Sequence, residues 1–98
     1  MAIMIGSSPN PYTFTVAAGA TETVYSSTGA TLPKDMSATL VPTSGGTGFF
    51  EYRVSSADAW TVWEPGVVSA KTTTVMAGPV QALRVTATTQ LATVHLAR

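Results

Sequence analysis

The chain has 98 residues, which is enough for one hydrophobic core and too few for two. It contains no cysteine, its five basic and five acidic residues cancel to a formal net charge of zero, and only 10% of its residues are charged, against roughly 25% in an average soluble domain. The absence of cysteine excludes a disulfide framework, a thiolate nucleophile and a cysteine-ligated zinc site. The low charge argues against nucleic acid or a membrane surface as partner, because binding to either needs clustered lysine and arginine.

Residues 1–10 are expected to form an apolar arm or a first strand, ahead of a domain that comprises residues 11–98. The apolar run stops at residues 6–9, which read Gly-Ser-Ser-Pro. A signal peptide needs a basic region and a longer apolar run, and a membrane helix needs about 18 apolar residues, so we expect neither. An arm of this kind either joins the sheet or docks on a neighbouring subunit. Its large apolar side chains are Met1, Ile3, Met4 and Ile5.

Short strand-like segments separated by turn residues follow along the rest of the chain. β-branched and aromatic residues dominate these segments, and good helix formers are scarce. A turn is expected at residues 44–46 (Ser-Gly-Gly), with residues 45–48 (Gly-Gly-Thr-Gly) as a hairpin turn, and Pro65 and Gly66 are expected at the two central positions of a type II turn. The expected strands lie at residues 12–16, 23–25, 39–41, 48–54, 60–63, 71–76, 80–88 and 92–96. Eight short strands in one domain predict an all-β fold, either a single antiparallel β-sandwich or a small barrel.

In the segment at residues 48–54, alternation predicts an inward set and an outward set of side chains. Phe49 falls in the outward set beside Glu51 and Arg53, and these two charged residues share a face and could pair with each other. The inward set consists of Phe50, Tyr52 and Val54.

Two further aromatic residues are expected to point outward. Trp60 and Trp63 lie three positions apart, so a strand sends them to opposite faces, and we assign Trp60 to the core and Trp63 to the outside or to an edge of the sheet. Tyr25 is opposed to its neighbour Val24 and is also assigned to the outside. Exposed aromatic residues concentrate in protein interfaces, so these residues and the arm define a candidate interface. Its members are Met1, Ile3, Met4, Ile5, Tyr25, Phe49 and Trp63.

The sequence carries no pattern of catalytic residues. Its one histidine, His95, is expected on the outer face of the last strand, and no nucleophile or metal motif accompanies it. The carboxylates are spread singly along the chain. We therefore expect a non-enzymatic protein without a cofactor or a metal ion.

The composition and strand pattern resemble those of small structural proteins of tailed-bacteriophage virions, in particular capsid decoration (cement) proteins and head-fibre base domains. The resemblance rests on a short, cysteine-free all-β chain rich in threonine, alanine and glycine, and on segments such as residues 11–19 and 78–85. It implies a decoration protein of the virion, assembled in the host cytoplasm, that binds the shell in many copies. The implied partners are the major capsid protein or other virion proteins, and the implied oligomer is a dimer or trimer.

Two other functions stay open at this point. A tail, connector or fibre component would share the composition and differ only in its position on the particle. A carbohydrate-binding or host-adhesion module would bind sugars through exposed aromatic rings and carboxylates. The side chains available to it are Tyr25, Tyr52, Trp60, Trp63, Asp58 and Glu64.

Overall fold

The computed structural model describes residues 12–26, 36–76 and 80–97, and in these segments the chain forms eight β-strands and no helix. None of these residues therefore belongs to a helix with the length and apolar character needed to cross a membrane. The strands are β1 (Tyr12–Val16), β2 (Thr21–Ser26), β3 (Met36–Pro42), β4 (Gly48–Arg53), β5 (Thr61–Val62), β6 (Thr72–Met76), β7 (Ala82–Ala87) and β8 (Ala92–Ala97). The expected all-β fold is confirmed, and the arm at residues 1–10 lies outside the described residues.

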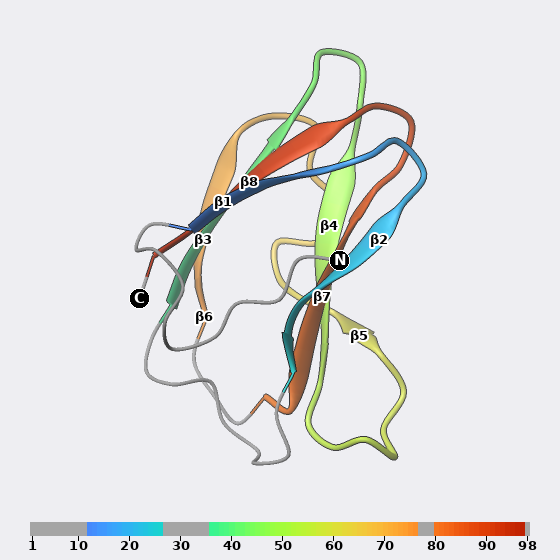
Figure 1. Cartoon of the computed structure of the whole chain (residues 1–98), viewed down its shortest axis with the longest axis vertical. Helices are drawn as coiled ribbons and strands as arrows, with labels where there is room; N and C mark the ends of the chain where they lie inside the picture. The colour runs from blue at the N-terminus through green and yellow to red at the C-terminus, as the bar shows by residue number, and fades with distance from the viewer. Residues whose placement is uncertain (1–11, 27–35, 77–79, 98) are drawn as a thin grey trace.

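The strands form two antiparallel sheets of four, packed face to face as a β-sandwich (Figure 1). One sheet has the order β1-β8-β3-β6, and the other has the order β2-β7-β4-β5. Consecutive strands belong to the same sheet only at β4 and β5, so nearly every connection crosses from one sheet to the other. Of the two architectures predicted, the sandwich is the one observed.

The strand order follows a simple rule. β1 pairs with β8, β2 with β7, β3 with β6 and β4 with β5, as if the chain were first folded in half into one long antiparallel ribbon. The ribbon then wraps so that β8 also pairs with β3 and β7 with β4. This order, with eight strands in two Greek keys, is that of a jelly roll.

The core lies between the two sheets and is built from small and medium-sized side chains. Along β7 and β8 the buried residues alternate with more exposed ones, because successive side chains of a strand point to opposite faces. Among the residues that the structure describes, the largest buried side chain is Phe50 on β4, which is 5% exposed. The inward positions predicted for the last two strands are confirmed: Leu83, Val85, Ala87, Ala92, Val94 and Leu96 are all at most 1% exposed.

The inward set predicted for β4 is correct except at its end. Phe50 is buried and Tyr52 packs against the core, whereas Val54 is 42% exposed. The strand ends at Arg53, so the alternation that was extended to Val54 no longer applies there.

Two turns differ from expectation. The turn at residues 43–46 is closed by a bond from Gly46 N to Thr43 O of 2.8 Å, with Gly45 at a φ of 85°, but it joins β3 to β4 across the two sheets and is not a hairpin. Pro65 lies at the third position of its turn, because Gly66 N donates to Trp63 O at 2.8 Å, and the Glu64–Pro65 peptide is cis, as in a type VI turn. A type II turn centred on Pro65 and Gly66 is therefore wrong.

Candidate functional site

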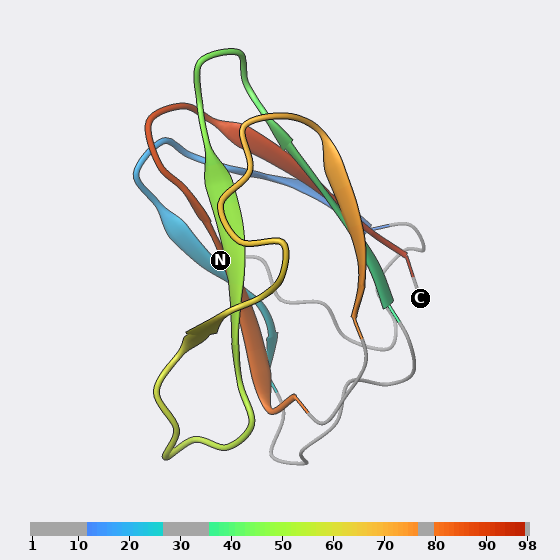
Figure 2. The ribbon, with the colours of Figure 1, turned by 180° about the vertical axis from the view of Figure 1, so that it is seen from behind.

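An open cleft of about 520 Å³ lies on one flank of the sandwich, between the edge strands β5 and β6. Figure 2 shows the connection from β5 to β6 running across this flank. Thr74 of β6 donates its hydroxyl to the carbonyl oxygen of Glu64 at 3.4 Å, which ties that connection to the edge of β6. The cleft is thus lined by residues of both sheets and of the connection between them.

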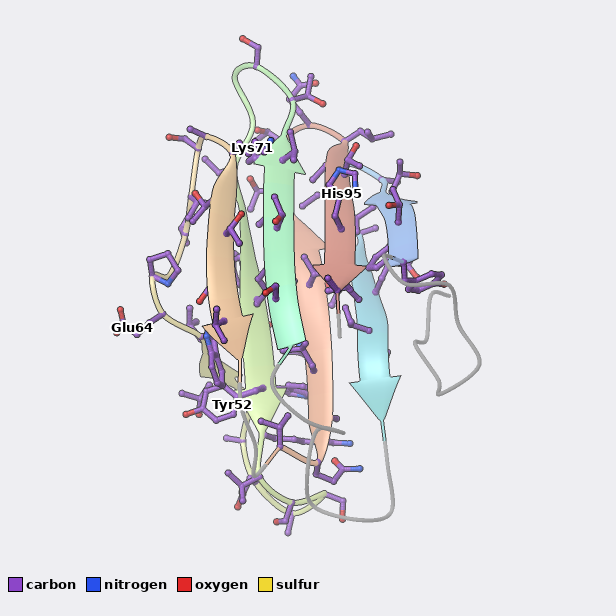
Figure 3. The ribbon with its side chains drawn as sticks, turned by 90° about the vertical axis from the view of Figure 1, so that its left-hand side faces the viewer. Tyr52, Glu64, Lys71 and His95 are labelled. Carbon is purple, nitrogen blue, oxygen red and sulfur yellow. The ribbon has the colours of Figure 1, made fainter. Side chains whose placement is uncertain are left out.

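Two aromatic rings form one wall of the cleft. Tyr52 and Trp63 meet edge to face, with ring centroids 4.9 Å apart and an interplanar angle of 77°. The side chain of Glu64 is exposed beside them, and Figure 3 shows Tyr52 and Glu64 on the same flank of the molecule, away from His95. The remaining lining consists of Thr61, Val62, Thr74 and Val75. Rings, hydroxyls and a carboxylate therefore converge on one opening.

A second cluster, formed by Arg53, Trp60 and Arg84, lies on the outer face of the β2-β7-β4-β5 sheet. The ring of Trp60 contacts two guanidinium groups, with Cζ of Arg84 at 4.1 Å and Cζ of Arg53 at 4.7 Å from its centroid. Both distances are within the range of a cation–π interaction. Arg84 Nε also donates to Glu51 Oε1 at 2.9 Å, and Arg53 Nε donates to Gln81 Oε1 at 2.9 Å.

The core position predicted for Trp60 is wrong, because its ring lies half-buried against the two arginines. Of the two positions predicted for Trp63, the outside is wrong, because the ring packs against the core, and the edge is observed, because the ring lines the cleft between the edge strands β5 and β6. The prediction assumed a strand over residues 60–63, but β5 contains only Thr61 and Val62, and both are exposed. Outside a strand the two-residue alternation does not hold, so neither tryptophan could be assigned in this way.

Glu51 and Arg53 lie on the outer face of β4 as expected, but they bind other residues and do not pair with each other. Glu51 lies opposite Arg84 in the register between β4 and β7, and it pairs with that residue. Directly opposed positions on neighbouring strands bring side chains closer than positions two apart on one strand.

The other members of the predicted interface are only partly placed. Phe49 is half-buried on the outer face of β4, opposite Thr86 of β7. The main chain of Tyr25 lies in β2 opposite Leu83, but its side chain lies outside the described part of the structure. The interface members in the arm lie outside the described segments; they are Met1, Ile3, Met4 and Ile5.

The histidine lies on the outer face of β8, as predicted. Its Nδ1 is 2.9 Å from the hydroxyl oxygen of Thr13 on β1. Threonine hydroxyls also meet across strands at Thr39–Thr73 and at Thr21–Thr86, each 2.8 Å apart. Within residues 12–26, 36–76 and 80–97, no group of three or more His, Cys, Asp or Glu side chains is arranged to hold a metal ion.

Comparison of the chain with protein-family models, with curated proteins and with solved structures finds no match.

Proposed function

We propose that this chain is a non-enzymatic structural protein of a virus particle, a decoration protein that binds the assembled shell in many copies. The strand order carries the proposal, because eight-stranded jelly rolls recur in viral capsid domains. A protein that binds only the assembled lattice stabilises it by mass action, and many weak contacts add up through multivalency.

The edges of the β1-β8-β3-β6 sheet also support a protein that lies against neighbours. Both edge strands, β1 and β6, are five residues long and contain no charged residue. Isolated soluble proteins commonly protect such edges with charges, prolines or bulges. On the other sheet, β2 contains Glu22 and a register irregularity, and β5 has only two residues. Uncharged edges favour association with a second copy, as a dimer or trimer, or with capsid protein.

Antibodies against the purified chain are expected to label the heads of virus particles at many positions, because a decoration protein repeats over the whole shell. Immunogold electron microscopy of purified particles measures this. Labelling confined to tails would contradict decoration and favour a tail, connector or fibre component. Absence of the chain from purified particles would contradict both.

The arm is tested in the same system. A variant that lacks residues 1–5 is expected to lose attachment to particles while its unfolding temperature stays that of the full chain. Co-sedimentation with stripped particles measures attachment, and the variant Val67→Ala, at a 61% exposed position outside β1 and β6, controls for general surface change. Unchanged attachment of the truncated chain would remove the arm from the binding surface.

A carbohydrate-binding or host-adhesion module is a second candidate, and the cleft between β5 and β6 favours it. Sugar rings stack their C–H faces on aromatic rings, and their hydroxyls need donors and acceptors nearby. Tyr52 and Trp63 supply the rings, and Glu64 and Thr74 the polar groups. The volume of about 520 Å³ falls in the range of small-molecule sites.

Titration with a panel of neutral monosaccharides is expected to move the indole N–H signal of Trp63 in a nitrogen–proton NMR spectrum. The signal of Trp60 serves as an internal control, because the chain has only two tryptophans and Trp60 does not line the cleft. Replacing Glu64→Gln removes a charged acceptor and is expected to weaken binding by about tenfold. Asp58→Asn, which alters a carboxylate outside the cleft, is the matched control. A Trp63 signal that no sugar moves would contradict this function.

A further inference from the structure

Two of the three lysine and arginine residues in the described part of the chain lie together on the outer face of one sheet. Arg53 comes from β4 and Arg84 from β7, and Trp60 comes from the β4–β5 loop, at the lower end of the molecule in Figure 1. We call the surface formed by Arg53, Trp60 and Arg84 the arginine–tryptophan face. With Glu51 beside it, this face holds two positive charges and one negative charge.

The arginine–tryptophan face is packed and not formed by freely moving side chains. Each guanidinium is held by its contact with Trp60 and by one hydrogen bond from Nε, to Glu51 or to Gln81. These contacts hold the two arginines in place before any partner arrives.

Both arginines keep hydrogen-bond donors available. A guanidinium carries five N–H donors, and each Nε–H is already used. The terminal NH₂ groups of Arg53 and Arg84 make no hydrogen bond to any residue in the described segments. Guanidinium groups bind carboxylates with paired, charge-assisted hydrogen bonds, and fixing them beforehand reduces the entropy lost on binding.

We propose that the arginine–tryptophan face docks a carboxylate-bearing segment of a partner protein. The inference rests on the proposed attachment role and names the chemistry of one contact. Charge complementarity favours a protein segment with aspartate or glutamate side chains. Two arginines are too few to hold a nucleic-acid backbone, for which affinity grows with the number of phosphates neutralised. Tryptophan and arginine are also among the residues most enriched at interface hot spots, the positions where truncation to alanine costs the most binding free energy.

The test is an NMR titration of the whole chain with a short oligo-glutamate peptide, with oligo-glutamine as the neutral control. The indole N–H signal of Trp60 is expected to move and that of Trp63 to stay in place. Raising the ionic strength from about 0.01 M to about 1 M shortens the Debye length from roughly 30 to 3 Å and is expected to weaken binding strongly.

Three variants locate the contact. Arg53→Gln and Arg84→Gln are each expected to weaken oligo-glutamate binding by about tenfold, because each removes charge-assisted hydrogen bonds. Lys71→Gln removes the same charge from the position just before β6, a strand of the other sheet, and is expected to change binding less than about twofold. Arg53→Gln leaves the Glu51–Arg84 pair in place, and the amide spectrum of each variant reports whether the fold is intact.

Several outcomes would overturn the proposal. A Trp60 signal unmoved by oligo-glutamate is one, and equal weakening by Lys71→Gln is another, since it indicates non-specific attraction. Tighter binding of heparin than of oligo-glutamate would point to a sulfated glycan instead of a protein. The titration uses no virus particle, so it is independent of the labelling experiment: a Trp60 shift supports this contact even if the particles carry no label.

Discussion

Replacing Leu83 by alanine is expected to destabilise the protein more than truncation of either tryptophan. Leu83 lies on β7, an inner strand, with 0% exposure, and it belongs to the core cluster between the sheets. Buried leucine-to-alanine changes cost about 2–5 kcal/mol, because a cavity remains where the side chain was. In a domain of this size about 3 kcal/mol lowers the melting temperature by roughly 12–24 °C.

Thermal unfolding followed by circular dichroism measures this effect. The matched control is Val75→Ala on β6, where the side chain is 64% exposed and the expected change is within about 0.5 kcal/mol. Equal melting temperatures for the two variants would contradict the packing of β7 against the opposite sheet.

The second large effect is expected at Trp63, and it separates the two tryptophans. Trp63 packs against the core, meets Tyr52 edge to face and lines a small void of about 10 Å³ together with Leu40 and Phe50. Full burial of a tryptophan makes its truncation cost about 3–5 kcal/mol, and for this half-buried ring we expect about 2–3 kcal/mol. Truncation of Trp60 instead removes two cation–π contacts, which together contribute about 1–2 kcal/mol to the free energy of unfolding.

Urea unfolding of Trp63→Ala and Trp60→Ala compares the two positions directly, with the remaining tryptophan as the fluorescent probe in each case. Trp63→Ala is expected to be the less stable of the two, and Trp60→Ala is expected to affect oligo-glutamate binding more than stability. The reverse order of stability would restore the orientation that the sequence pattern predicted.

Alternation predicted the sheet faces correctly on β1, β4, β7 and β8. On β1, Phe14 and Val16 turn toward the core while Thr13 and Thr15 are exposed. Such a pattern is local, because it follows from the pleat of a single strand and needs no knowledge of its neighbours. At Trp60 the same alternation led to the wrong face, and at Trp63 it did not show the contact with the core, since the strand between them has only two residues.

The sequence predicted several residues of the candidate site but not which of them lie together. Tyr52, Trp63 and Glu64 were named as possible sugar contacts, and the structure brings all three to one cleft. Trp60 and Asp58 do not line it; Asp58 instead accepts a bond from Ser55 N at 3.0 Å within its own loop. The grouping depends on how the β5–β6 connection crosses the open flank, which no spacing in the sequence encodes.

By itself, the sequence determined that the protein has an all-β fold of eight short strands with one core, because alternation, turn residues and the scarcity of charge are properties of neighbouring positions. Only the tertiary structure decided the jelly-roll order, the pairing of Glu51 with Arg84 and the placing of Trp60 between two arginines. These contacts join residues such as Glu51 and Arg84, which are 33 positions apart. Their energies depend on register and on which sheet each strand enters, and those are set by the packing of the whole chain.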